Sequence, residues 1–288
     1  MILPQFIHKV TNSFVLWADH TLLNRGQAYT NVTGSLTNYA DDSLPTPYSG
    51  WGAPYKEWVT DSSVSGATVP SGFYANNTFA PRSSSLVIDF QNGRIISSGI
   101  STGAAVTGSY AVKDFNIYTT NQDEESLVVE ICQNQSEPYN QIGSDISTPY
   151  LPPKTMKIPA IFINAQTQQN VPLALGGEDE SKVRINMIVF AHDPYQLDGA
   201  LGLFADTSDE TFLELPLEAA PITQWGDIKG GSYNYSNLVA ASGSSTFYID
   251  DVETSKLTDS LRRGLKTELY IGFAEFLVGQ IRNPRANG

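Results

Sequence analysis

Short stretches in which apolar and polar residues alternate recur along the chain, and Gly, Pro, Asn or Ser residues separate them. The clearest stretch runs from Val183 to Val189, with Ile185 and Met187 at a period of two and Ile188 on the opposite side. This period is typical of β-strands, because successive side chains of a strand point to opposite faces of the sheet. The apolar residue on the opposite side indicates that this strand is buried on both faces near its end. The recurring pattern predicts a mainly β fold.

The strongest local signal is a β-hairpin at residues 86–97. Two apolar stretches flank Asn92-Gly93, a dipeptide that favours a type I′ turn because both residues adopt positive φ at little cost. A hairpin centred on this two-residue turn places Phe90 opposite Ile95. We expect one face of the hairpin to be more apolar than the other.

Two more segments are interpreted as strands. Residues 126–132 form a short apolar stretch after the acidic turn 121–125. Residues 268–282 show both the alternation of a strand and the spacing of a helix. Gly272, Gly279 and the aromatic content of this segment favour a long strand.

A helix is predicted at residues 14–25. Ser13 is a good N-cap residue, and Gly26 is suited to the position that follows a helix. Trp17 and Leu23 contribute to a broad apolar stripe. The helix either packs on the core of its own chain or packs on a neighbouring subunit, and the sequence leaves both alternatives open.

One short internal helix is predicted at residues 195–204, because Asp193 supplies an N-cap and Pro194 the first helical position. The elements together predict a mainly β fold, an antiparallel β-sandwich of jelly-roll type with an N-terminal helix and this internal helix. We expect a single β-rich domain over residues 1–288, in which residues 1–30 form an N-terminal helical arm. A Pro-rich stretch marks a candidate break between lobes near residues 145–155.

Charge and composition exclude several classes of protein. The chain carries 17 Lys and Arg against 30 Asp and Glu, a net charge of −13, and a basic face for general nucleic-acid binding is not expected. Hydrophobic residues make up 41% of the chain, which is too many for a disordered protein. A single cysteine cannot form an internal disulfide. No stretch is apolar enough to span a bilayer, so no membrane partner is predicted.

No catalytic, cofactor-binding or metal-binding residues are predicted. Three isolated histidines and one cysteine provide no closely spaced pair for zinc. Residues 99–103 match the sequence of a nucleophile elbow, but no helical pattern follows them. Asp250 and Asp251 are adjacent in a predicted strand and therefore point to opposite faces. We expect a protein that is not an enzyme and that needs no cofactor, and an enzyme is kept as the third hypothesis.

Aromatic residues are concentrated in the polar stretch 27–85. They either fill the interior of the sandwich, anchor an interface between subunits or bind a sugar by stacking. Together with the apolar stripe of the first helix, they supply the candidate subunit-interface residues. These candidates are Phe14, Trp17, Leu23, Trp51, Tyr55 and Trp58.

Four segments carry a resemblance to a known class of protein. They are residues 14–29, residues 51–67, the Asn92-Gly93 hairpin and residues 247–252. In these features the chain resembles virion structural proteins of tailed bacteriophages, components of the neck where the head joins the tail. The resemblance implies a non-enzymatic, ring-forming connector that is assembled in the host cytoplasm and resides in the virion.

The resemblance also implies partners. These are further copies of the chain in a homo-oligomeric ring and neighbouring virion proteins of the portal, neck or tail. Contact with the genome would be passive and independent of sequence, because an acidic channel repels phosphates. Tail-tube, sheath-capping and decoration roles remain open within this class. The alternative from a different class is a carbohydrate-binding module of a receptor-binding or tail-fibre protein, supported by the aromatic residues.

Overall fold

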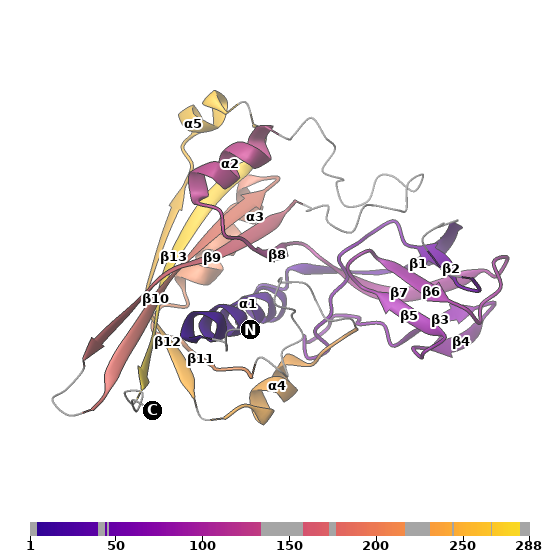
Figure 1. Cartoon of the computed structure of the whole chain (residues 1–288). Helices are drawn as coiled ribbons and strands as arrows, with labels where there is room; N and C mark the ends of the chain where they lie inside the picture. The colour runs from indigo at the N-terminus through magenta and orange to yellow at the C-terminus, as the bar shows by residue number, and fades with distance from the viewer. Residues whose placement is uncertain are drawn as a thin grey trace.

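Two curled β-sheets lie side by side, and a long N-terminal helix packs on one of them and leads into the other (Figure 1). The computed structural model describes residues 5–39, 44, 46–133, 158–172, 177–216, 231–243, 245–265 and 267–282. The predicted mainly β, sandwich-like class with an N-terminal helix is confirmed.

The first sheet has seven strands and a core of its own. Its strands are β1 (Tyr29–Tyr39), β2 (Ser49–Gly52), β3 (Gly72–Ala75), β4 (Thr78–Pro81), β5 (Leu86–Asp89), β6 (Arg94–Ser97) and β7 (Val106–Lys113). They are ordered β4-β3-β7-β1-β2-β6-β5, and each described pairing is antiparallel. Buried aromatic rings fill the curl, and Trp58 stacks on Tyr110 with ring centroids 4.4 Å apart.

The predicted hairpin is confirmed as β5 and β6, but its register differs. Ile88, and not Phe90, pairs with Ile95, so residues 90–93 form a four-residue connection in place of a two-residue turn. Carbonyl groups of this connection accept hydrogen bonds from the backbone of residues 53–58. The longer connection is therefore stabilised by a neighbouring loop that local sequence does not show.

The second sheet has six strands and the order β11-β12-β13-β10-β9-β8. The strands are β8 (Asn116–Thr119), β9 (Ala160–Pro172), β10 (Asp179–Ala191), β11 (Thr211–Leu213), β12 (Thr246–Lys256) and β13 (Tyr270–Arg282). The pairing of β8 with β9 is parallel, and the others are antiparallel. The strand predicted at residues 268–282 is confirmed as β13. Burial in β10 alternates at first and then becomes continuous from Ile185, as predicted.

Five helices are described, where the sequence predicts two. They are α1 (Phe6–Asn24), α2 (Glu124–Gln133), α3 (Pro194–Ala205), α4 (Tyr235–Ala241) and α5 (Asp259–Gly264). The predicted internal helix is confirmed as α3, and its N-cap Asp193 accepts a hydrogen bond from the backbone N–H of Gln196 at 2.8 Å. The strand predicted at residues 126–132 is wrong, because this segment belongs to α2.

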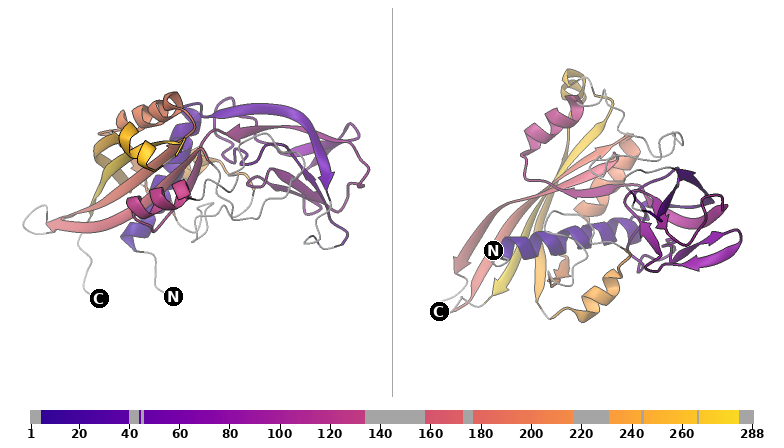
Figure 2. Two further views of the ribbon diagram at one scale, coloured as in Figure 1. Left: turned by 90° about the horizontal axis from the view of Figure 1, so that it is seen from above. Right: turned by 45° about the vertical axis from the view of Figure 1, so that its right-hand side comes forward.

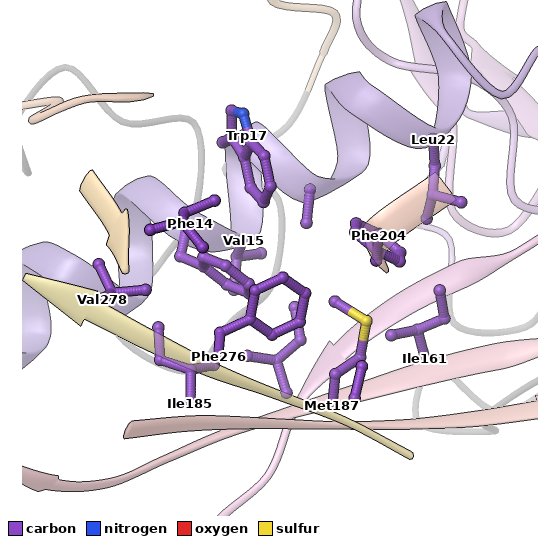
Figure 3. Close-up of a cluster of buried hydrophobic side chains, with 14 of the residues drawn as sticks. Phe14, Val15, Trp17, Leu22, Ile161, Ile185, Met187, Phe204, Phe276 and Val278 are labelled. Carbon is purple, nitrogen blue, oxygen red and sulfur yellow. The ribbon is translucent and has the colours of Figure 1, made fainter. Parts of the chain in front are cut away.

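The N-terminal helix α1 begins eight residues earlier than predicted. Ser13, the expected N-cap, lies in the middle of the helix, where its hydroxyl accepts a hydrogen bond from the backbone N–H of Leu215 at 2.9 Å. Apolar side chains of α1 pack against β9, β10 and β13, as Figure 3 shows for Phe14 and Trp17 above Met187 and Phe276. Of the two alternatives for this helix, the structure shows packing on the core of its own chain.

The chain crosses from the first sheet to the second between β7 and β8, at residues 114–115. Helix α1 packs on the six-stranded sheet although it precedes the seven-stranded sheet in the sequence. The strands of the first sheet therefore all precede those of the second, whereas α1 precedes both sheets and packs on the second. The candidate break near residues 145–155 lies outside the described residues, and the single-domain assignment stays a prediction.

Candidate functional site: a polar junction and two open sheet edges

A group of buried and half-buried polar side chains lies where the C-terminal part of α1 meets the seven-stranded sheet. It draws on α1, the loop between β2 and β3, strand β7 and the segment that leads into α4. Its members are Asp19, His20, Asp61, Ser63, Lys113, Tyr233 and Tyr235. We call this group the polar junction, because it joins the helix of one sheet to the strands and loop of the other.

The first half of the polar junction is an ion pair between Asp19 and Lys113. Lys113 Nζ lies 2.7 Å from Asp19 Oδ1 and 2.8 Å from Oδ2, and each side chain is only 9% exposed. The hydroxyl of Tyr233 donates a third hydrogen bond to Asp19 Oδ2 at 3.2 Å. Burial and the nearby carboxylates raise the pKa of Tyr233 well above its ordinary value, so its hydroxyl remains a donor.

The second half of the polar junction is centred on Asp61, whose side chain is fully buried. Asp61 Oδ2 accepts a hydrogen bond from His20 Nδ1 at 2.7 Å, while Oδ1 accepts from the N–H and hydroxyl of Ser63 and the N–H of Tyr235. Burial by itself would raise the pKa of Asp61. The donors outweigh burial and hold this pKa below its ordinary value.

The imidazole of His20 stacks on the ring of Tyr235, with centroids 4.4 Å apart. Burial and the charge of Asp61 raise the pKa of Tyr235 to about 12. Next to these rings, Tyr233 exchanges backbone hydrogen bonds with the loop at residues 60–62. The polar junction therefore fastens the segment before α4 to both α1 and the loop of the other sheet.

Serine, histidine and aspartate in one cluster invite comparison with a catalytic triad, but their order differs. In a triad the serine hydroxyl bonds to the imidazole, which takes up its proton. Here Ser63 Oγ donates to Asp61 at 2.7 Å, and Asp61 lies between Ser63 and His20. Because the imidazole is not hydrogen-bonded to the hydroxyl, this geometry connects chain segments and does not activate Ser63 as a nucleophile.

Five of the six predicted interface residues lie in the interior of the chain. Phe14 and Trp17 belong to the core beneath α1, and Leu23 packs between α1 and the seven-stranded sheet. Trp51 and Trp58 lie in the core of the seven-stranded sheet. A side chain enclosed by its own chain is not available to a second subunit. These five residues are core residues in this fold, which corrects their interpretation as interface anchors.

The sixth predicted interface residue, Tyr55, is half-buried against the core of the seven-stranded sheet. Its carbonyl accepts a hydrogen bond from Trp58 Nε1 at 2.9 Å. The aromatic residues that suggested sugar binding are also mostly internal, since Phe73 is fully buried. Tyr74 and Phe79 remain exposed as a ring pair on the β3–β4 hairpin.

Both edges of the six-stranded sheet are left partly open. β9 has 13 residues, but β8 pairs only with its first four, up to Ile163. β12 has 11 residues, and its outer contacts with β11 and the preceding turn end at Ile249. In the part of the chain that the structure describes, no strand pairs with the outer edge of β9 after Ile163 or of β12 after Ile249. We call these two stretches the open edges.

The described residues also bear on metal sites and membrane spans. Among the described ranges, no group of three or more His, Cys, Asp or Glu side chains is arranged to hold a metal ion. The residues that match a nucleophile elbow form bends and turns between β6 and β7. No helix within the described ranges is both long and apolar enough to cross a membrane.

Comparison with known proteins adds no assignment. The polar junction and the open edges are the two features that bear on the function. The chain matches no protein-family model, and no curated protein is similar to it in sequence.

Proposed function

We propose that this chain is a non-enzymatic structural component of a tailed-bacteriophage virion, a connector that forms a homo-oligomeric ring where head and tail join. The observation that carries the proposal is the pair of open edges. An open edge presents backbone N–H and C=O groups to which no described strand is paired, and such an edge is a template for pairing with another chain. In β9 and in β12, the open edge extends over more than half of the length of the strand.

The polar junction supports the same proposal. A ring closes only if every subunit presents its contact surfaces at the same angle. The buried ion pair and the hydrogen bonds of Asp61 fasten α1, β7 and the segment before α4 to one another. This arrangement fixes the orientation of the two sheets, which a ring-forming subunit requires.

Charge and partners fit this role. A net charge of −13 suits a ring around a DNA channel, because acidic walls repel the phosphates and let the genome pass. The neighbours of such a ring are virion proteins of the portal, neck or tail. Its place is the virion, after assembly in the host cytoplasm.

Electron microscopy of the purified full chain tests the proposal. Closed rings with a single rotational symmetry are the expected result. Isolated particles of subunit size at every protein concentration would contradict it. A sample that remains in this state while converting a small molecule or a polysaccharide would point to the enzyme hypothesis.

A further inference from the structure

Among the described residues, the open edge of β9 has little of the usual protection of an edge strand, apart from a β-bulge between Ala165 and Gln168. Edge strands are normally shielded by charged side chains, by proline or by a covering element. From Ala160 to Gly177 the sequence contains no charged residue, and in β9 itself the one proline is the last residue, Pro172. The end of β9 and the beginning of β10 also project beyond the helices that cover the sheet (Figure 2). Among the residues that the structure describes, nothing therefore covers this edge against another strand.

The open edge of β12 has the opposite character. Asp250, Asp251 and Glu253 make it acidic, with a single Lys256 at its end. Pairing this edge with its own copy would place carboxylates opposite carboxylates, which is unfavourable. An uncharged strand avoids this repulsion. Within the described sheet, β9 offers such a strand.

Strand direction favours the pairing of β9 with β12. Three antiparallel pairings, β12 with β13, β13 with β10 and β10 with β9, separate the two open edges. β9 and β12 therefore run in opposite directions. When two copies stand side by side in the same orientation, β9 of one copy meets β12 of the next in an antiparallel arrangement, the commoner and slightly more stable form.

The positions along the strands also match. Glu253 pairs with Glu275, Glu275 with Asn186 and Asn186 with Asn164, so Glu253 lies level with Asn164. Two copies at equal height thus bring the open edge of β12 beside the beginning of the open edge of β9. A shift along the strands lengthens the pairing, and strand tilt produces such a shift when a sheet closes into a ring.

We propose that the open edge of β9 in one copy pairs antiparallel with the open edge of β12 in the next copy, so that the six-stranded sheets join into one continuous sheet around the ring. This inference rests on the proposed function and names its contact. The contact is heterologous, because two different edges meet. When the ring closes, a heterologous contact pairs both open edges of every copy with neighbouring copies.

Cysteine cross-linking between copies tests this pairing in the full chain. Single-cysteine variants are made at three exposed positions on each edge, and each β9 variant is mixed with each β12 variant. The positions are Gln166, Gln169 and Val171 on β9, and Glu253, Thr254 and Ser255 on β12. A short bis-maleimide cross-linker tolerates a difference of a residue in register. The native Cys132 is buried and gives the background in the unmodified chain.

We expect covalent dimers in mixtures of a β9 variant with a β12 variant and none in either variant alone. The double variant Gln169→Cys with Thr254→Cys should give a ladder of multimers. Ser35→Cys is the matched control, because this exposed position lies on β1, in the interior of the seven-stranded sheet. It should not cross-link with either partner.

Light scattering on the same samples distinguishes a failure of the strand pairing from a failure of the proposed function. Oligomers without cross-links in any mixture would overturn the strand pairing and leave the proposed function intact. Dimers formed by a β9 variant alone would show an isologous contact and would also overturn the pairing. Monomers in every sample, the unmodified chain included, would contradict the proposed function itself.

Discussion

At the scale of single residues, the polar junction contains a buried ion pair that water does not screen. Removing one member of such a pair leaves the other charge buried without compensation. Lys113 and Asp19 are in this situation, whereas Arg184 and Glu275 form an ion pair on exposed strand positions. The two pairs should therefore differ strongly in their contribution to the free energy of unfolding.

We expect Lys113→Met to lower the free energy of unfolding by about 3–5 kcal/mol, because Asp19 loses its counter-charge in a buried site. Urea unfolding followed by circular dichroism measures this change. Arg184→Met is the matched control, and its expected cost is about 0–1 kcal/mol. Adding Asp19→Asn to Lys113→Met should recover part of the loss. An equal loss of unfolding free energy in Lys113→Met and Arg184→Met would contradict the role given to the polar junction.

The polar junction also predicts how stability depends on pH. The pKa of Asp61 is lower in the folded chain than its ordinary value of 3.8. Its contribution to stability is therefore present above 3.8 and is lost as the pH falls through the folded pKa. In urea titrations at decreasing pH, the Asp61→Asn variant should lose less stability below pH 3.8 than the unmodified chain does.

Asp114 provides a control of opposite sign, because burial raises its pKa in the folded chain. Its ionised form is disfavoured by folding, so its contribution declines as the pH rises through the raised pKa. Compared with the unmodified chain, the Asp114→Asn variant should be more stable at neutral pH, and this advantage should shrink at acidic pH. The same pH response in both variants would contradict the assigned pKa shifts.

The residues of the polar junction could not be predicted from the sequence. His20 and Asp61 are 41 positions apart, and Tyr235 follows Asp61 after another 174. Their contact depends on two returns of the chain to the end of α1, one in the loop between β2 and β3 and one at the start of α4. Five of the six predicted interface residues proved to be core residues for a related reason. A large aromatic residue such as Trp51 or Trp58 is suited equally to a core and to an interface, and sequence alone does not show which surface encloses it.

At the scale of elements, patterns confined to one segment were reliable. The alternation in β10, the N-cap Asp193 of α3 and the extended form of β13 follow from neighbouring residues and are confirmed. Segment 126–132 shows the limit. Its β-branched apolar residues suggest a strand, but Asp123 accepts a hydrogen bond from the N–H of Ser126 and caps a helix. The acidic residues that follow Asp123 were the signal for this helix.

The β5–β6 hairpin shows why register needs tertiary information. Gly93 has a φ of 59°, and a Cβ atom at this position would lie 2.3 Å from the carbonyl oxygen of Tyr55. The turn is therefore shaped by the loop packed against it. Local sequence identifies the hairpin and its glycine, but it does not reveal the loop.

We expect Gly93→Ala to lower the free energy of unfolding by more than about 1 kcal/mol, because alanine is strained at positive φ and meets backbone at this position. Thermal and urea unfolding measure the loss. Gly34→Ala on β1 is the control, since a Cβ atom there would have no neighbour within 4 Å. A loss at Gly93 no larger than that at Gly34 would contradict the close contact with Tyr55.

At the scale of the whole molecule, the mainly β class followed from the sequence, while the arrangement of the sheets did not. The order β11-β12-β13-β10-β9-β8 brings together strands that are far apart in the chain, and α1 joins the second sheet from the opposite end of the sequence. The open edges exist because the short strands β8 and β11 cover only part of long neighbours. Strand lengths on both sides of a pairing are needed to recognise this feature.

On the proposed function, the chain acts by assembling with copies of itself. The most direct measurement is the mass of the purified full chain in solution, determined by light scattering over a range of protein concentrations. We expect a discrete particle whose mass is a whole-number multiple of 31.4 kDa, as a closed ring requires. A mass of 31.4 kDa at every concentration would contradict it.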